Sequence, residues 1–142
     1  MTVVLDDHLV RDWMARRDDA LASAVGADQV ATTNLWYVRL CKSAARAGRG
    51  AILEGWAATE RRALIAGLVA LPGEVMVVPM RQLAWRMGEL SNDHHGLSTL
   101  GAEAVAAAIE TGGRLLVSAR DDGPGIRQCC ERIGISYHAI PR

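Results

Sequence analysis

The first fifteen residues contain the pattern of a strand, an acidic turn and a helix. Residues 2–5 (Thr-Val-Val-Leu) form a short, apolar, β-branched run, which is typical of a buried strand. Asp6 and Asp7 follow at once, and the next apolar residues recur at helical spacing: Leu9, Val10, Trp13 and Met14. The pattern therefore predicts that both aspartates lie where the first strand passes into the first helix.

The same alternation continues along the chain. Further strands are predicted at 29–31, 74–78, 115–117 and 135–140. Helices are predicted from Thr32 or Thr33 to near Gly48, at 56–71 before Pro72, from Pro79 to Leu90, from Ser98 to Glu110, and at 126–133 before Gly134. The continuous apolar run at 75–78 within this predicted strand suits a strand that is covered on both faces.

Strands that alternate with helices indicate an α/β fold. We expect a three-layer α/β/α arrangement with a central, mainly parallel sheet of about five strands. At 142 residues the chain has the length of one domain, 1–142. Ligands of such sheets bind at the carboxyl ends of the strands, which here means beside Asp6, Pro79 and Ser118.

Composition narrows the possible partners. Sixteen basic and sixteen acidic residues balance, so no global positive field attracts phosphate backbones, and any contact with RNA needs a local patch. Arginine clusters offer such patches: Arg16 with Arg17, Arg46 with Arg49, Arg61 with Arg62, and Arg81 with Arg86. The sequence predicts neither a leader nor a membrane span, and its three cysteines lack a metal-ligand spacing, so we expect a cytoplasmic protein.

Two segments of the chain resemble the PIN-domain family, which includes the ribonuclease toxins of bacterial toxin–antitoxin pairs. They are the opening Val-Val-Leu-Asp6-Asp7-His8-Leu-Val and the stretch from His95-Gly-Leu-Ser-Thr-Leu-Gly101 to Leu-Leu-Val-Ser-Ala119. The resemblance implies an aspartate directly after the first strand and further acidic residues at the positions of Arg39 and Gly101 and at or near Ala119. Asp6 alone retains the family's residue, so the acidic site is degenerate.

These replacements bear directly on catalysis. Metal-assisted phosphodiester cleavage needs several carboxylates around Mg²⁺ or Mn²⁺, because these hard cations take oxygen ligands and must activate a water molecule. Arg39 would place a permanent positive charge where the family binds its metal ion. We expect Arg39 to pair with Asp6 in place of a metal, and we expect no cofactor.

Other acidic residues are candidates to rebuild the site. Glu103 lies two helical residues beyond Gly101, a rotation of roughly 200°, so we expect a solvated surface charge. Asp121 and Asp122 follow the strand end where the family keeps its last aspartate. They either bend back to the site or cap the last helix, and capping is the favoured interpretation. Asp7 is expected to point away from Asp6 and to cap the first helix.

Histidines and tryptophans give weaker signals. His8 is expected to hydrogen-bond a phosphate or Asp6, or to sit at the helix start. Asp93, His94 and His95 resemble a metal site, but adjacent histidines cannot face one point, so a solvated loop is favoured. The four tryptophans, at 13, 36, 56 and 85, occupy apolar helical positions and are expected in the core or at a dimer face.

These observations lead to two main hypotheses. The first is a PIN-like protein, derived from a toxin, that lacks nuclease activity and acts by binding RNA or a protein partner, with a homodimer expected from the resemblance. The alternative is a Mg²⁺- or Mn²⁺-dependent ribonuclease of a toxin–antitoxin system, with a rearranged site built from Asp6, Asp7, Asp121 and Asp122, and with Glu103 as an outside candidate. A small antitoxin-like protein that covers an apolar groove is a further expected partner.

Overall fold

The computed structural model describes residues 1–46, 52–71 and 73–141. Its five strands are β1 (Thr2–Leu5), β2 (Gln29–Thr32), β3 (Val75–Val77), β4 (Arg114–Ser118) and β5 (Tyr137–Ile140). Its helices are α1 (Asp7–Ala15), α2 (Asp19–Val25), α3 (Asn34–Ala45), α4 (Ala58–Ala70), α5 (Met80–Asp93), α6 (Thr99–Thr111) and α7 (Pro124–Ile133). In the described chain, two helices follow each of β1, β2 and β3, and one helix separates β4 from β5.

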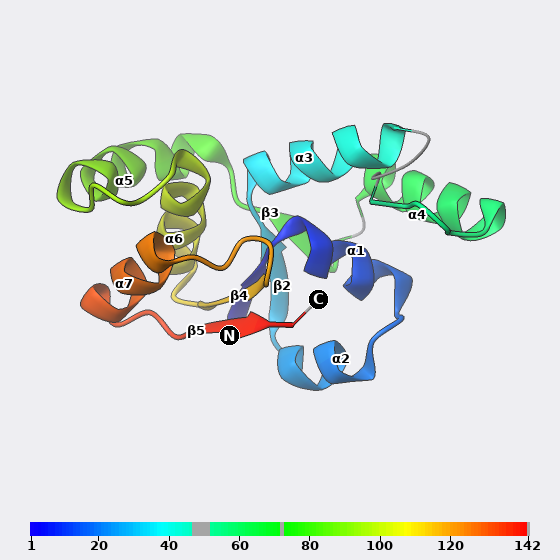
Figure 1. Cartoon of the computed structure of the whole chain (residues 1–142), viewed down its shortest axis with the longest axis horizontal. Coiled ribbons are helices and arrows are strands. Elements are labelled where there is room, and N and C mark those ends of the chain that lie inside the picture. The colour runs from blue at the N-terminus through cyan, green and yellow to red at the C-terminus, as the bar shows by residue number, and fades with distance from the viewer. Residues whose placement is uncertain (47–51, 72, 142) are drawn as a thin grey trace.

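The strands form one parallel sheet in the order β3-β2-β1-β4-β5. Helices cover both faces of this sheet, so the three-layer α/β/α arrangement is confirmed (Figure 1). One apolar core packs α5, α6 and α7 against one face of the sheet, and a second packs α1, α2, α3 and α4 against the other face. The central position of β1 places the residues that follow Leu5 in the middle of the sheet's carboxyl edge.

Several details differ from the sequence-based expectation. Helix α2 was not predicted, because its seven residues bury only Leu21 and Val25 and so show a single helical interval. Strand β3 lies at the sheet edge with Met76 37% exposed, so the prediction that this strand is covered on both faces was wrong. The predicted helix end near Gly48 and the stop at Pro72 lie outside the described residues.

The tryptophans divide between core and surface. Trp36 is buried in the core beside α6, which is one of the two expected places, whereas Trp85 on α5 is 82% exposed. A homodimer through such an exposed face stays a prediction. No helix within the described ranges has both the length and the hydropathy that a membrane span requires.

Candidate functional site

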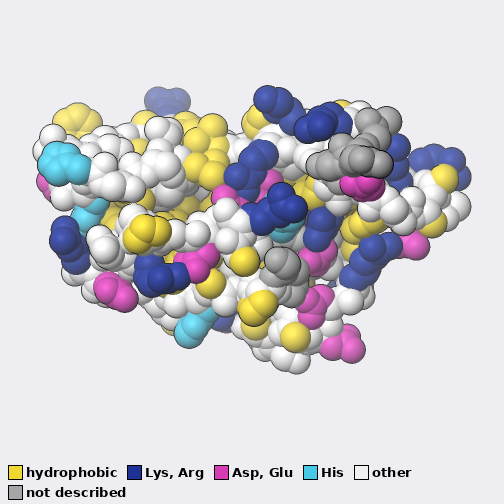
Figure 2. Space-filling view, in the orientation of Figure 1, with side chains coloured by type: hydrophobic (Ala, Val, Ile, Leu, Met, Phe, Trp, Pro, Cys, Tyr) yellow, Lys and Arg dark blue, Asp and Glu magenta, His cyan; other side chains and the backbone are white. Residues whose placement is uncertain are grey.

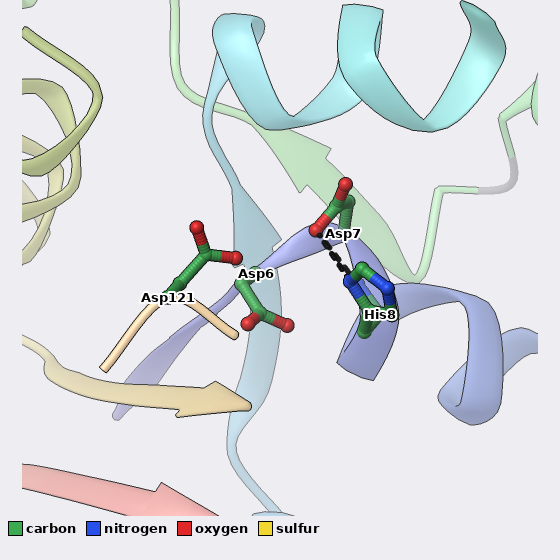
Figure 3. A group of neighbouring side chains, drawn as sticks. All are labelled: Asp6, Asp7, His8 and Asp121. Carbon is green, nitrogen blue, oxygen red and sulfur yellow. Dashed lines mark hydrogen bonds and ion pairs between the residues drawn. The ribbon is translucent and has the colours of Figure 1, made fainter. Parts of the chain in front are cut away.

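Acidic side chains converge at the carboxyl edge of the sheet, as the topology requires. Asp6 and Asp7 follow β1, and Asp121 lies in the loop that follows the neighbouring strand β4 (Figure 3). Arg39 projects from the second turn of α3, which begins after β2. Residues more than eighty positions apart in the sequence therefore meet at one point. We call Asp6, Asp7, Asp121 and Arg39 the carboxyl-edge cluster.

Asp6 is fully buried and is held by neutral donors. Its Oδ1 accepts the backbone N–H of Leu9 at 2.9 Å, so Asp6 is the N-cap of α1. Its Oδ2 accepts both the backbone N–H and the hydroxyl of Ser118, each at 2.6 Å. Burial raises the pKa of Asp6 to about 6, although the bonds from Ser118 and Leu9 work in the opposite direction. Asp6 thus ties β1 to β4 and to the first turn of α1.

Asp7, in contrast, receives the guanidinium of Arg39. Arg39 Nε donates to Asp7 Oδ2 and Nη2 donates to Asp7 Oδ1, both at 2.6 Å, which is a bidentate pair. Arg39 Nη2 also donates to Asp121 Oδ2. Burial alone would raise the pKa of Asp7, but hydrogen bonds from His8 and Arg39 outweigh it and lower that pKa to about 2. The same contacts raise the pKa of Arg39.

This geometry corrects two expectations about the first helix. Arg39 was expected to pair with Asp6, but it pairs with Asp7 and Asp121. Asp7 was expected to point away and to cap α1, but Asp6 is the cap and Asp7 is the first helical residue. Asp6 is still extended and Asp7 is already helical, so the strict alternation of a strand no longer applies at this step.

His8 completes the group of polar side chains without touching Asp6. Its Nδ1 lies 3.0 Å from Asp7 Oδ1, and its backbone N–H donates to the same oxygen at 3.0 Å (Figure 3). The structure therefore agrees with a position at the helix start and not with the expected bond to Asp6. Asp7 Oδ1 accepts from both His8 and Arg39, which leaves it crowded with donors.

Asp121 and Asp122 have separate environments. Asp122 accepts from Arg127 and from the hydroxyl of Tyr137, the latter at 2.6 Å, so it binds α7 and β5 and lies outside the cluster. The favoured prediction that one of the two aspartates caps α7 was wrong. The N-cap of that helix is Gly123, with no side-chain cap bond.

The structure contradicts the prediction that Glu103 is exposed to solvent. This residue is fully buried instead of solvated. Its carboxylate accepts the backbone N–H of Leu35 and the side-chain amide of Asn34, each at 2.9 Å, so it satisfies the N-terminus of α3. The rotation argument assumed a solvent-facing side of α6, but residues 101–108 are buried all round. The alanine-rich stretch around Glu103 is the sequence signal of that burial.

Gly101 and Ala119, where the resemblance implies acids, do not restore a carboxylate. A Cβ at Gly101 would lie 2.9 Å from Leu97 Cδ1, so a larger side chain needs Leu97 to move. Ala119 is exposed directly after β4. His94 ends α5 and is half-buried, whereas Asp93 and His95 are exposed. The candidate metal group in the described chain consists of Asp6, Asp7, His8 and Asp121, and not of the pair at 94 and 95.

The donor chemistry of that group suits a hard divalent cation, but Arg39 already occupies two of its carboxylates. One ligand atom from each of Asp6, Asp7, His8 and Asp121 lies within 4.8 Å of the others. Carboxylate oxygens are the ligands that Mg²⁺ and Mn²⁺ take. Arg39, however, already binds both oxygens of Asp7 and one of Asp121. A metal ion would have to displace this guanidinium.

Comparisons with known proteins identify no family. No family model matches the chain, and no curated protein shows significant similarity to it. The fold and the cluster therefore carry the functional argument.

Proposed function

We propose that this chain is a PIN-like protein that does not cleave RNA and works by binding a macromolecular partner. The observation that carries the proposal is the ion pair of Arg39 with Asp7 and Asp121, at the edge where a PIN-type nuclease would hold its metal ion. Asp6, the third carboxylate, is fully buried and accepts hydrogen bonds from the backbone N–H groups of Leu9 and Ser118.

Electrostatics supports this proposal. A divalent ion about 5 Å from a guanidinium is repelled by roughly 7 kcal/mol at an effective dielectric constant of about 20. That repulsion cancels the attraction that one carboxylate exerts on the ion from the same distance. Asp6 adds a full negative charge only well above the pKa of about 6 that its burial produces. The site therefore binds its own cation in preference to an external one.

The binding role points toward protein more than toward RNA. The formal net charge of the chain is +0, so the overall field does not draw a polyanion to the surface. A PIN-like fold that lacks a working metal site still has the surface that binds a partner. A toxin-derived protein of this kind therefore acts through the partner that it binds.

Metal titration together with an RNA cleavage assay tests the proposal. We expect neither heat of Mn²⁺ binding by calorimetry nor cleavage of single-stranded RNA in Mg²⁺ or Mn²⁺. The Arg39→Gln variant should gain Mn²⁺ binding, because Asp7 and Asp121 then lack a cation. Tight Mn²⁺ uptake by the wild-type protein, with RNA cleavage that disappears in Asp6→Asn, contradicts the proposal.

A second candidate function is a Mg²⁺- or Mn²⁺-dependent ribonuclease of a toxin–antitoxin system. The observation that favours it is the convergence of Asp6, Asp7, His8 and Asp121 in one group. In this case Arg39, whose side chain is 40% exposed, would swing out when the ion binds. Soaking crystals in Mn²⁺ separates the two candidates, since an ion held by three carboxylates with Arg39 turned to solvent supports the ribonuclease.

A further inference from the structure

A groove beside the carboxyl-edge cluster lies between α3 and the start of α6. Its volume is about 400 Å³, and we call it the α3 groove. Its lining residues come mainly from one face of α3: Leu35, Val38, Arg39, Lys42, Ser43 and Arg46, together with Leu100 of α6. The described lining contains cations and apolar groups but no carboxylate.

The cations of this groove follow the axis of α3. Arg39, Lys42 and Arg46 recur at intervals of three and four residues, which places them on one side of the helix. Arg39 is engaged by Asp7 and Asp121, whereas Lys42 and Arg46 are exposed to solvent. Arg61 donates to the backbone oxygens of Ala44 and Arg46 and adds a further positive charge at that end. Figure 2 shows dark blue side chains gathered over α3.

A second groove, between α1 and α4, differs in its charge balance. Trp13 and Trp56 line it, and its cation Arg16 pairs with Glu74, while Arg17 pairs with Glu60. Its charges are therefore compensated within the chain. Among the described residues no carboxylate pairs with Lys42 or Arg46, so the α3 groove keeps a positive charge that favours an anionic partner.

The apolar residues at the bottom of the α3 groove favour an acidic protein segment over single-stranded RNA as the anionic partner. Val38 is 52% exposed, and Leu35 and Leu100 lie beside it. Single-stranded RNA is held by aromatic rings on which its bases stack, and the described lining offers no aromatic ring. A helical segment with leucines on one side and acidic residues on its flank matches both the floor and the cations.

We propose that the α3 groove binds an acidic amphipathic segment of a protein partner. The inference rests on the proposed function, in which the protein binds and does not cleave. It adds the binding surface and the chemistry of the partner. Leucine side chains of the segment would cover Val38 and Leu100, and its glutamates would face Lys42 and Arg46.

Fluorescence anisotropy with a synthetic probe tests this inference. The probe is a labelled helical peptide with leucine at every third or fourth position and glutamate along one flank. We expect saturable binding to the wild-type protein that weakens about tenfold in the double variant Lys42→Glu, Arg46→Glu, because attraction becomes repulsion. Arg81→Glu changes the charge of an exposed cation on α5, outside the groove, and should alter affinity less than about twofold.

Two further arms make the outcome decisive. Val38→Ser should weaken peptide binding without a change of charge, which separates groove binding from general attraction. The inference is overturned if the peptide binds the wild-type protein and the double variant with equal affinity. It is also overturned if oligouridine RNA binds in the groove more tightly than the peptide does. RNA cleavage by the wild-type protein in Mn²⁺ would instead overturn the proposed function, and the peptide result would stand apart from it.

Discussion

Asp6 and Asp7 are neighbours in sequence and are almost equally buried, yet the protein holds them in opposite ways. Asp6 is 0% exposed and Asp7 is 2% exposed. Three neutral donors bind Asp6, and its pKa is raised to about 6. His8 and Arg39 both bind Asp7, and together they lower the pKa of Asp7 to about 2. At Asp6 the neutral hydrogen bonds thus fail to offset the cost of burial, whereas at Asp7 the bonds from His8 and from the guanidinium of Arg39 together more than offset it.

The difference assigns separate tasks to the two residues. Asp6 connects β1, β4 and α1 through backbone and hydroxyl groups, and it would do so with or without a cation nearby. Asp7 and Asp121 need a positive charge between them, and the chain supplies one from α3. Within the cluster, Asp6 therefore has a structural role, whereas Asp7 and Asp121 form an internal salt bridge with Arg39.

Removing the cation should produce the largest effect. Arg39→Gln leaves two buried carboxylates facing each other, and breaking a buried pair in this way costs about 3–5 kcal/mol. Because the Arg39 side chain is 40% exposed, we expect a loss of about 3 kcal/mol in the free energy of unfolding, measured by urea denaturation at pH 7. Added Mn²⁺ should restore part of the loss in the variant but leave wild type unchanged.

Arg81→Gln is the matched control, because Arg81 is an exposed arginine on α5. Its stability should stay within about 0.5 kcal/mol of wild type. If Arg39→Gln proves as stable as Arg81→Gln, the contrast between Asp6 and Asp7 does not depend on the ion pair.

The pH dependence of stability should show both aspartates with opposite signs. The pKa of Asp6 is higher in the folded chain than its ordinary value of 3.8, so the folded state binds more protons in this range. The free energy of unfolding should therefore rise by roughly 2 kcal/mol as pH falls from 6 to 4. The pKa of Asp7 is lower in the folded chain, so its stabilisation is present above pH 3.8 and is lost as pH falls toward 2.

Urea denaturation at a series of pH values measures this profile, and its maximum should lie near pH 4. Asp7→Asn should abolish the contribution of Asp7 to the decline on the acid side while leaving the rise due to Asp6. A stability that declines steadily from pH 6 to pH 4 would contradict the raised pKa of Asp6.

The hydroxyl of Ser118 offers a smaller test on the Asp6 side. Ser118→Ala removes one of two donors to Asp6 Oδ2 and retains the backbone N–H. A hydrogen bond to a charged group contributes about 1.5 kcal/mol, so the variant should lose that amount above pH 7. Its loss should shrink near pH 4, where Asp6 is protonated in the folded state. An equal loss at both pH values would show that the bond does not depend on the charge of Asp6.

The sequence predicted the layers and the place of the cluster for a definite physical reason. Strands that alternate with helices leave few arrangements other than a parallel sheet, and its carboxyl edge must receive whatever follows β1 and β4. Helix α2 was not predicted, because two buried residues are too few to show the helical periodicity of apolar positions.

The partners within the cluster were harder to predict. Whether Arg39 reaches Asp6 or Asp7 depends on a single step of backbone rotation after Leu5, which hydrophobic patterning does not encode. Glu103 was misplaced because a helix with apolar residues on every side has no solvent face from which to reason. Likewise, Asp121 and Asp122 are equivalent in any pattern, and only the course of the loop separates them.

Asp121→Asn and Asp122→Asn form a matched pair with the smallest expected effects. The charge of Asp121 contributes to the raised pKa of Asp6, so Asp121→Asn should lower that pKa and move the rise in stability to lower pH. Asp122 pairs with Arg127, whose side chain is 50% exposed, and accepts the hydroxyl of Tyr137, a bond that the amide oxygen of asparagine can also accept. Loss of such a surface pair should cost about 0.5 kcal/mol and leave the pH profile in place. The same chemical change at adjacent positions thus tests which side chain belongs to the cluster, because a pH shift in Asp122→Asn would place it there.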